Sequence, residues 1–316
     1  MKKKSLIIGI KGLNLSRTEF LLLKQINPWG IILFERNIKN ISQLKSLIIQ
    51  IKKCFNDKNF PILIDQEGGR VSRLNNIFDF TYYTQKFFGN MFEKNKMFVF
   101  KNYYENYINF LCHTFNYLGI NINTSPVLDI QRGKSNGIIG DRSFSTDKLI
   151  VSKLGKLCIQ FHNKNKIGTI IKHIPGHGAS NIDSHQFLPK TNLSRENLTK
   201  NDFFPFMNSK SFFAMTAHVK YNNFDSKNPA THSKILINEI IRKKMKFRGI
   251  IMTDDISMKA LKSDLKTNVI KSLDAGCNLI LHCNGNYSEA KLISKIVPYL
   301  DKFLLAKTKE FYNFLN

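Results

Sequence analysis

Short, almost continuously hydrophobic segments recur along the chain. Their residues are apolar at consecutive positions rather than at every second one, which is typical of parallel strands buried on both faces. All of them are too short to be helices. The predicted strands are 6–10, 30–34, 61–64, 120–123, 168–171, 212–217, 249–252 and 278–281.

Longer segments of helical period separate most of these strands. Examples are 41–54, 98–118, 149–163, 233–245 and 267–275, and Gly276 is expected as the C-cap of the last one. Strands that alternate with helices in this way predict a (β/α)8 barrel. An open doubly wound sheet is the alternative, but only Gly9 and Gly12 follow the first strand, without the GxGxxG fingerprint. Because we find no linker and no repeat, we expect residues 1–316 to form one barrel domain.

The composition is that of an ordinary globular protein, with 42% hydrophobic residues among 316. The N-terminus imitates a signal peptide, but Lys11 interrupts its apolar run too early. Nothing approaches the roughly twenty apolar residues of a membrane span. The five cysteines form no CxxC and are expected to be reduced and buried. We therefore expect a soluble, cytoplasmic monomer that does not bind membranes.

The net charge of +25 raises the question of a nucleic-acid partner. Nucleic-acid modules gather basic residues on one face and favour arginine, whereas most basic residues here are lysines scattered along the whole chain. Lysine is abundant together with asparagine, isoleucine and phenylalanine, which A/T-rich codons encode. Base composition is the simpler explanation, and we expect no nucleic-acid partner.

Polar residues follow five of the predicted strands. These residues are Asp65, Lys172 with His173, His218, Asp254 with Asp255, and His282. A single charged residue after a strand usually caps a helix or lies in a solvated turn. In a barrel, however, the carboxyl ends of all strands meet at one rim, where active sites form. Five strands together therefore predict a polar pocket at the barrel mouth.

The segment 172–189, KHIPGHGASNIDSHQFLP, contains three histidines: His173, His177 and His185. Histidine exchanges protons near neutral pH, so this pattern favours proton-transfer chemistry, with Asp183 placed to hydrogen-bond His185. A solvated glycine-rich loop with incidental histidines is one alternative. A zinc site is another, but the spacing lacks cysteines and matches no usual zinc signature. We expect neither a metal nor a cofactor.

These residue types suit the cleavage of glycosides. A carboxylate at a strand end can act as nucleophile, and a loop histidine can protonate a leaving group and then activate water. Cations can hold hydroxyls or a carboxylate of the substrate. In the segment 65–71, DQEGGRV, Asp65 stands at a strand tip, and the Gly-Gly turn that follows lets the backbone approach a ligand.

Several long motifs, in order, resemble the family 3 glycoside hydrolases, and among them the bacterial β-N-acetylglucosaminidases of cell-wall recycling. The motifs are GIILFERNI at 30–38, DQEGGRVSRL at 65–74, SPVLDI at 125–130, IGDRSF at 139–144, KHIPGHGASNIDSHQFLP at 172–189, MTAHV at 215–219, GIIMTDDISMKA at 249–260 and LDAGCNLIL at 273–281. The resemblance covers nearly the whole chain.

The resemblance implies a role for individual residues. Asp254 matches the nucleophile, and His185 matches the acid/base, with Asp183 as its dyad partner. Residues that match the binding positions for the N-acetylglucosamine unit are Asp65, Arg73, Arg142, Lys172 and His173. Asp255 is expected only to cap the next helix.

The implied reaction is retaining hydrolysis through a covalent glycosyl-aspartate. The implied substrate is a muropeptide fragment, N-acetylglucosamine β-1,4-linked to anhydro-N-acetylmuramic acid, with or without peptide. A phosphorylase that uses phosphate instead of water is an enzymatic alternative. A degenerate barrel that only binds sugars is a third interpretation, against which the intact KH, DSH and TDD positions argue.

Overall fold

Eight parallel strands close into a barrel, which confirms the predicted fold class. The computed structural model describes residues 2–132, 137–180 and 188–316. The barrel strands are β1 (Lys4–Gly9), β2 (Pro28–Leu33), β3 (Ile62–Ile64), β4 (Ile122–Asn123), β5 (Gly168–Ile174), β7 (Phe213–Thr216), β9 (Ile250–Asp255) and β10 (Leu279–His282). Around the barrel they follow chain order, and β10 pairs with β1 to close it. Each corresponds to a predicted strand.

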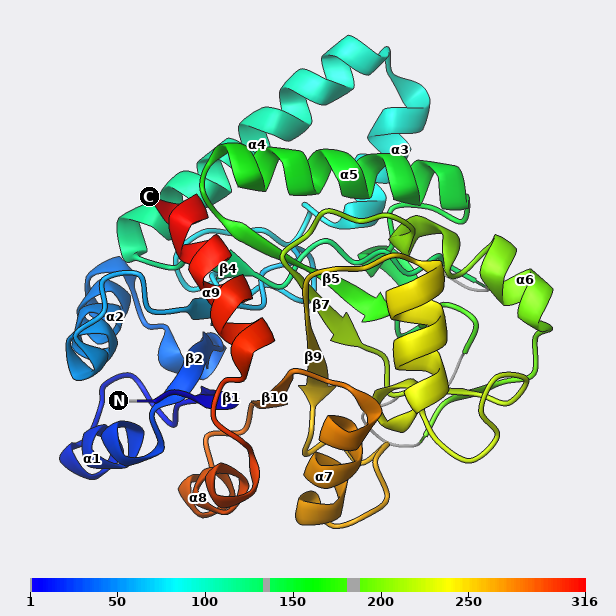
Figure 1. Ribbon diagram of the computed structural model, residues 1–316. Helices are drawn as coiled ribbons and strands as arrows, with labels where there is room; N and C mark the ends of the chain where they lie inside the picture. Colours follow the sequence, from blue (N-terminus) through cyan, green and yellow to red (C-terminus); the bar gives the residue numbers. More distant parts are fainter. Residues whose placement is uncertain (1, 133–136, 181–187) are drawn as a thin grey trace.

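Helices surround the barrel, as Figure 1 shows. They are α1 (Arg17–Ile26), α2 (Ile41–Phe55), α3 (Gln85–Lys94), α4 (Met97–Leu118), α5 (Lys148–Lys164), α6 (Arg195–Lys200), the π-helix η5 (Ile235–Lys244), α7 (Leu265–Ala275), α8 (Tyr287–Ile296) and α9 (Lys302–Leu315). Polar N-caps start several of them; Asn40, for example, accepts a hydrogen bond from the backbone N–H of Gln43. Gly276 ends α7 with a φ of 111°, which confirms the predicted C-cap.

Short elements complete the loops. Single turns of 3-10 helix lie at η1 (Glu35–Asn37), η2 (Gly140–Arg142), η3 (Phe204–Phe206) and η4 (Ala230–His232). Two further strands, β6 (Lys190–Thr191) and β8 (Lys220–Tyr221), pair with each other apart from the barrel. The pattern of hydrophobic residues did not predict this small ladder, because each of its strands begins with a lysine and neither belongs to an apolar run.

The barrel strands are buried on both faces, which explains their continuous hydrophobic sequences. Inward-facing residues form one core that fills the barrel: Ile7, Trp29, Ile32, Leu63, Ile122, Ile170, Phe213, Met215, Ile250, Met252, Leu279 and Leu281. Leu304 and Phe311 of α9 join this core, so α9 covers the barrel as an additional element beyond the helical ring.

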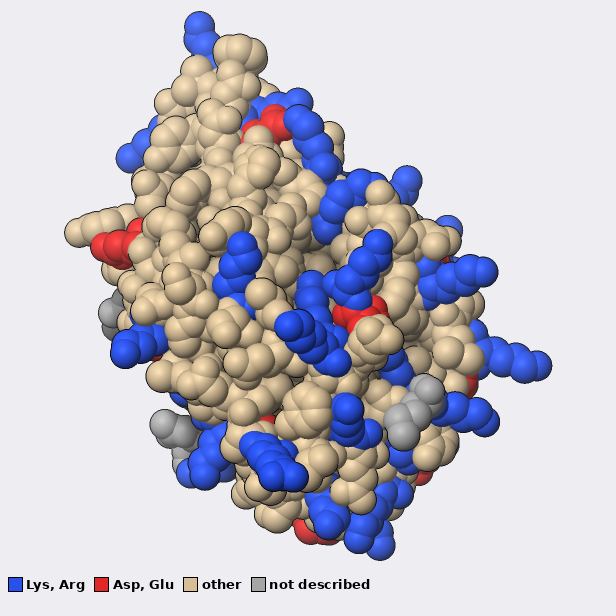
Figure 2. All heavy atoms as spheres, turned by 90° about the vertical axis from the view of Figure 1, so that its left-hand side faces the viewer, with Lys and Arg blue, Asp and Glu red and all other residues tan. Residues whose placement is uncertain are grey.

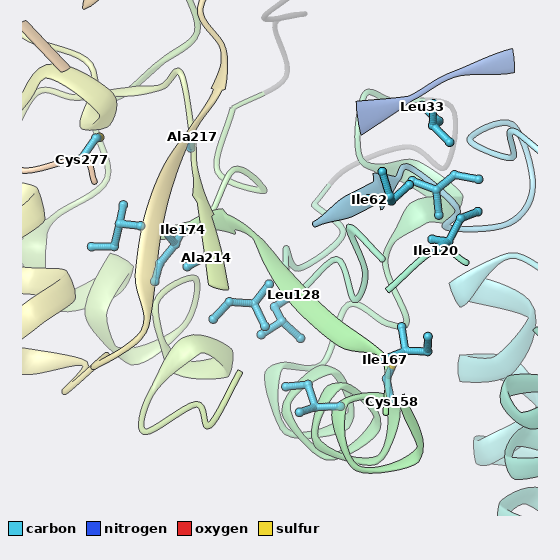
Figure 3. Packing of buried hydrophobic residues seen from close by; sticks show 14 of the residues in the cluster. Leu33, Ile62, Ile120, Leu128, Cys158, Ile167, Ile174, Ala214, Ala217 and Cys277 are labelled. Carbon is cyan, nitrogen blue, oxygen red and sulfur yellow. The ribbon is translucent and has the colours of Figure 1, made fainter. Parts of the chain in front are cut away.

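Outward-facing residues of the same strands pack against the surrounding helices. Figure 3 shows part of this second layer, with Ile62, Ile174 and Ala214 on the strands and Cys158 on α5. Successive residues of a strand point to opposite faces, so Ile170 belongs to the inner core and Ile171 to the outer layer. This alternation also decides which polar residues at the strand ends face the barrel mouth.

Lysine and arginine side chains are spread over the face shown in Figure 2, among few acidic ones, rather than gathered in a stripe. Within the described residues, no helix is both long and apolar enough to cross a membrane. Cys54, Cys112, Cys158 and Cys277 are buried free thiols, as predicted, whereas Cys283 is only partly buried. Cys283 differs because it follows β10 and lines the cavity at the barrel mouth.

Candidate active site

A cavity of about 200 Å³ opens at the carboxyl ends of the barrel strands. Every predicted site residue within the described part of the chain lines it: Asp65, Arg73, Arg142, Lys172, His173 and Asp254. Apolar residues such as Ile32, Phe34 and Met215 complete the wall. The predicted polar pocket is therefore present. Asp183 and His185, the predicted acid/base pair, lie outside the described residues.

Asp65 follows β3 directly and is held by three donors. Lys172 donates to Asp65 Oδ1 at 2.6 Å, Arg73 donates to Oδ2 at 2.7 Å, and the Thr124 hydroxyl also donates to Oδ1. Burial raises the pKa of the Asp65 carboxyl, but Lys172 and Arg73 lower it far more, so the pKa lies well below its usual range. Asp65 is a fixed carboxylate that can accept hydrogen bonds from substrate hydroxyls.

Glu67 is a second buried carboxylate, and it was not among the predicted site residues. Arg142 binds it with two hydrogen bonds, Nε to Oε2 at 2.7 Å and Nη2 to Oε1 at 2.8 Å. The Lys172 ammonium lies 2.5 Å from Glu67 Oε1. Burial raises the pKa of Glu67, but Arg142 and Lys172 outweigh it, so the pKa is lowered. Glu67 thus orients two cations that line the cavity.

Asp129 performs the corresponding task for His173. Its Oδ2 lies 2.7 Å from His173 Nδ1 and accepts the His173 backbone N–H at 3.1 Å. The other oxygen, Oδ1, accepts the backbone N–H of His177 at 2.6 Å. Asp129 is completely buried, and this pairing holds the imidazole of His173 in one orientation with Nε2 toward Arg142, 3.5 Å away. Asp129, like Glu67, was not predicted as a site residue.

Asp254 stands on β9, two residues after Met252, and so faces the cavity as Met252 faces the barrel interior. Its Oδ1 accepts the backbone N–H of Asp255 at 2.8 Å. Burial raises the pKa of the Asp254 carboxyl, but His173 and His218 lower it by more, and the pKa lies below its usual value. Asp254 is therefore an ionised carboxylate at neutral pH, as a nucleophile must be.

Asp255 does not cap the next helix, contrary to expectation. Its Oδ1 accepts the backbone N–H groups of Ser257 and Cys283, while Asp264 caps α7. Asp255 instead ties the end of β9 to the end of β10. A carboxylate that ends a strand finds unpaired backbone donors in its own turn, before the chain reaches the helix.

Two of the predicted rim histidines do not line the cavity. His282 faces outward, with Nε2 2.8 Å from Glu289 of α8, because its neighbour Leu281 occupies the inner face of β10. His218 is buried beside the site, with Nδ1 2.7 Å from the Thr231 hydroxyl and Nε2 3.1 Å from the carbonyl oxygen of Asp255. The prediction that the polar residues after all five strands meet in the pocket was wrong for His218 and His282, although Met215 of β7 and Leu281 of β10 line the cavity.

Comparison with known proteins identifies the family. Residues 4–307 match the Glycosyl hydrolase family 3 N terminal domain. The chain belongs to glycosyl hydrolase family 3. This confirms the resemblance inferred from the motifs and makes the protein a glycoside hydrolase.

Relatives within the family are named β-hexosaminidases. One from Haemophilus influenzae is 34% identical over 287 residues, which are 89% of the chain and 79% of the relative. One from Hydrogenovibrio crunogenus is 33% identical over 275 residues, 84% of the chain and 75% of the relative. Among solved structures, NagZ from Neisseria gonorrhoeae in complex with N-trifluoroacetyl-D-glucosamine superposes with a TM-score of 0.87 at 27% identity, covering 98% of the chain and 90% of that structure.

Glu67 and Asp129 were detectable in principle, because both lie in motifs that carry the family resemblance. Glu67 lies in DQEGGRVSRL and Asp129 in SPVLDI. The position of each residue in its motif does not indicate a site, because the partner side chain that lines the cavity comes from a distant segment.

In the part of the chain that the structure describes, no group of three or more His, Cys, Asp or Glu side chains is placed to hold a metal ion.

Proposed function

We propose that this family 3 glycoside hydrolase is a retaining β-N-acetylglucosaminidase. Its substrate is N-acetylglucosamine β-1,4-linked to anhydro-N-acetylmuramic acid, with or without peptide, as released during cell-wall recycling. The β-hexosaminidase relatives support cleavage of an amino-sugar glycoside. The N-acyl glucosamine bound to the similar NagZ structure supports glucosamine as the sugar.

Asp254 carries this proposal, because it is an ionised carboxylate at the wall of a small polar cavity. It attacks the anomeric carbon as the bond to the leaving oxygen breaks, and His185 gives that oxygen a proton. Water then attacks the anomeric carbon of the glycosyl-aspartate. His185 takes the proton of that water, and the Asp254 carboxylate leaves with its charge restored.

His185 and Asp183 take these roles from their sequence motif alone. A histidine acid/base replaces the second carboxylate of most retaining glycosidases. The leaving fragment here bears a carboxylate, and a neutral or cationic imidazole does not repel it as a second carboxylate would. The net charge of +25 also attracts such an anionic substrate.

The remaining cavity residues bind the sugar. Asp65 accepts hydrogen bonds from hydroxyls, and Lys172 and Arg142 donate to sugar oxygens while they stay paired with Asp65 and Glu67. Fixed donors and acceptors that need no reorganisation lower the barrier because the geometry is prepared before the substrate binds. His173, oriented by Asp129, adds an imidazole nitrogen to this set.

The test is hydrolysis of 4-nitrophenyl N-acetyl-β-D-glucosaminide by the purified protein, with and without phosphate. We expect turnover without phosphate and a loss of at least about a thousandfold in Asp254→Asn. Asp274→Asn, which changes an exposed aspartate on α7, is the matched control and should keep full activity. Turnover that requires phosphate would indicate a phosphorylase, and no turnover at all would refute the proposal.

The covalent intermediate has its own test. A slow fluorinated N-acetylglucosaminide with a good leaving group should add one sugar mass to the peptide that contains Asp254. A sugar on any other peptide, while activity is lost in step with labelling, would reject Asp254 as the nucleophile.

A further inference from the structure

The side chain of His177 lines the same cavity, but the proposed reaction gives it no role. It is 2% exposed. Within the described residues, neither of its ring nitrogens has a hydrogen-bond partner. Buried polar groups in proteins are almost always hydrogen-bonded, so an imidazole with two unpaired nitrogens at the wall of a binding cavity needs an explanation.

The backbone, rather than the ring, holds His177 in this position. Its N–H donates to Asp129 at 2.6 Å, and the preceding carbonyl, of Gly176, accepts the Tyr221 hydroxyl at 2.6 Å. On the other side, a Cβ on Gly178 would come within 2.0 Å of the Ile130 carbonyl oxygen. The turn is therefore pressed against neighbouring backbone at Gly178. It holds the imidazole at the cavity wall without using a ring nitrogen.

The surroundings of the ring favour its neutral form. Burial lowers the pKa of His177 to about 4, and the neighbouring His173 and Arg142 act in the same direction, against Asp129. The ring packs edge to face against His173, with the centroids 5.8 Å apart. A neutral imidazole offers one N–H donor and one acceptor nitrogen. A sugar hydroxyl also donates one hydrogen bond and accepts others, so the two groups are complementary.

A metal ion is a poorer match for these nitrogens. No group of three or more metal-ligating side chains surrounds His177 in the described portion of the chain. A purely packing role is also a poor match, because an apolar ring would fill the same space without burying two unpaired polar atoms.

We propose that His177 binds one hydroxyl of the sugar in the active-site cavity and so helps to select the substrate. This inference rests on the proposed function, since it assigns a further binding residue to the same site. The two ring nitrogens of an imidazole point in different directions, so a single hydroxyl engages only one of them, and we assign one hydroxyl to the ring.

The test compares His177→Phe with the unchanged protein on 4-nitrophenyl N-acetyl-β-D-glucosaminide and on its 3-, 4- and 6-deoxy analogues. Phenylalanine keeps the edge-to-face packing and removes both ring nitrogens. We expect kcat/KM on the parent substrate to fall by about three- to tenfold, the size of one neutral hydrogen bond. On one deoxy analogue the two proteins should be equal, whereas on the other two the difference should persist.

Two controls separate this contact from a general disturbance. His113→Phe, at an exposed position of α4, should match the unchanged protein on every substrate. His177→Asn restores a donor and an acceptor, and we expect it to recover part of the discrimination lost in His177→Phe. If the phenylalanine protein does not fold, His177→Leu, which also removes both ring nitrogens, takes its place in the comparison.

An equal loss on the parent and on all three deoxy analogues would overturn the inference, because a disturbed site is indifferent to which hydroxyl is missing. No loss on any substrate would overturn it as well. If the unchanged protein does not cleave the parent substrate at all, it is the proposed function that fails. The two failures are thus distinguishable.

Discussion

Replacing Glu67 by glutamine would remove one buried charge from the network that orients Arg142 and Lys172. The side chain of Glu67 is 1% exposed and that of Lys172 is 3% exposed, so this ion pair lies away from bulk water. Arg142 loses a charged partner for two of its N–H groups, and Lys172 keeps the Asp65 carboxylate and the Thr124 hydroxyl as acceptors. The substitution keeps the shape of the side chain but turns an ion pair into buried, poorly compensated positive charge.

The expected cost follows from that burial. Removal of one partner of a buried ion pair destabilises a protein by about 3–5 kcal/mol. The glutamine oxygen can still accept one hydrogen bond and Asp65 still neutralises Lys172, so we expect the lower end, about 3 kcal/mol. Because Arg142 and Lys172 also line the cavity, we expect kcat/KM to fall by roughly tenfold or more.

Unfolding in urea, followed by tryptophan fluorescence, measures the stability. Trp29 is the single tryptophan of the chain and lies completely buried inside the barrel, so its emission reports the loss of the core. The matched control is Glu239→Gln, which removes an exposed carboxylate paired with Lys243 on the same helix. Exposed pairs of this kind contribute about 0–1 kcal/mol, so the control should unfold almost like the unchanged protein.

The dependence on pH gives a second, independent check. The pKa of Glu67 is lowered below its usual value of about 4.5, so the folded state favours the ionised form. The stabilisation that the ionised Glu67 provides is therefore fully present above about pH 4.5 and is lost as the pH falls through the lowered folded-state pKa. The difference in free energy of unfolding between Glu67→Gln and the unchanged protein should therefore become smaller in acid. If Glu67→Gln at neutral pH loses no more free energy of unfolding than Glu239→Gln does, Glu67 does not stabilise Arg142 and Lys172 as described.

Three further changes test other parts of the structure. Gly178→Ala would place a Cβ 2.0 Å from the Ile130 carbonyl oxygen, and we expect lower activity and a lower melting temperature. Gly12→Ala, whose Cβ would meet no atom within 4 Å, is the control and should change neither. Equal behaviour of the two alanine variants would be inconsistent with close packing of the turn at Gly178. His162 is buried, with Nδ1 toward the Cys158 carbonyl and Nε2 toward Asn123, and burial lowers its pKa from 6.5 to about 4. The unfolded state therefore binds a proton first as the pH is lowered from 6.5 to about 4. Over that range we expect this residue to reduce the free energy of unfolding by up to about 1.4 kcal/mol for each pH unit. The free energy of unfolding of His162→Gln should lack this part of the pH dependence. If the two proteins differ by the same free energy of unfolding at every pH, the prediction is wrong. For His185→Ala we expect a far greater loss of rate on substrates with poor leaving groups than on activated aryl glycosides; equal losses would speak against its role as the acid.

The order of the elements was predictable from hydrophobic patterning, because it depends on local sequence. Strands buried on both faces leave unbroken apolar segments, such as 168–171, and helices leave a period that ends at a cap, such as Gly276. The very short β4 was found for the same reason, since Ile122 is buried inside the barrel. The ladder between β6 and β8 was not found, because its residues, Lys190–Thr191 and Lys220–Tyr221, form no apolar run.

Site residues could be predicted without the family motifs only where they directly follow a strand. Asp65 and Asp254 were identified in this way, and both line the cavity. The same reasoning was wrong for His282, because a residue at a strand end points inward or outward according to its register with the residues before it. Arg142 follows no strand, and its role as a sugar-binding residue was implied by the family motif.

The sequence by itself therefore determined the barrel, the rim on which polar groups gather and, through its motifs, the family. Only the tertiary structure decided that Glu67 pairs with Arg142 and Lys172, that Asp129 holds His173, and that His177 keeps two unpaired nitrogens at the cavity wall. Patterning reports whether a residue is buried, which is a property of its own segment. The partner that makes a buried charge or a buried imidazole tolerable comes from a distant segment, and closing the barrel is what brings the two together.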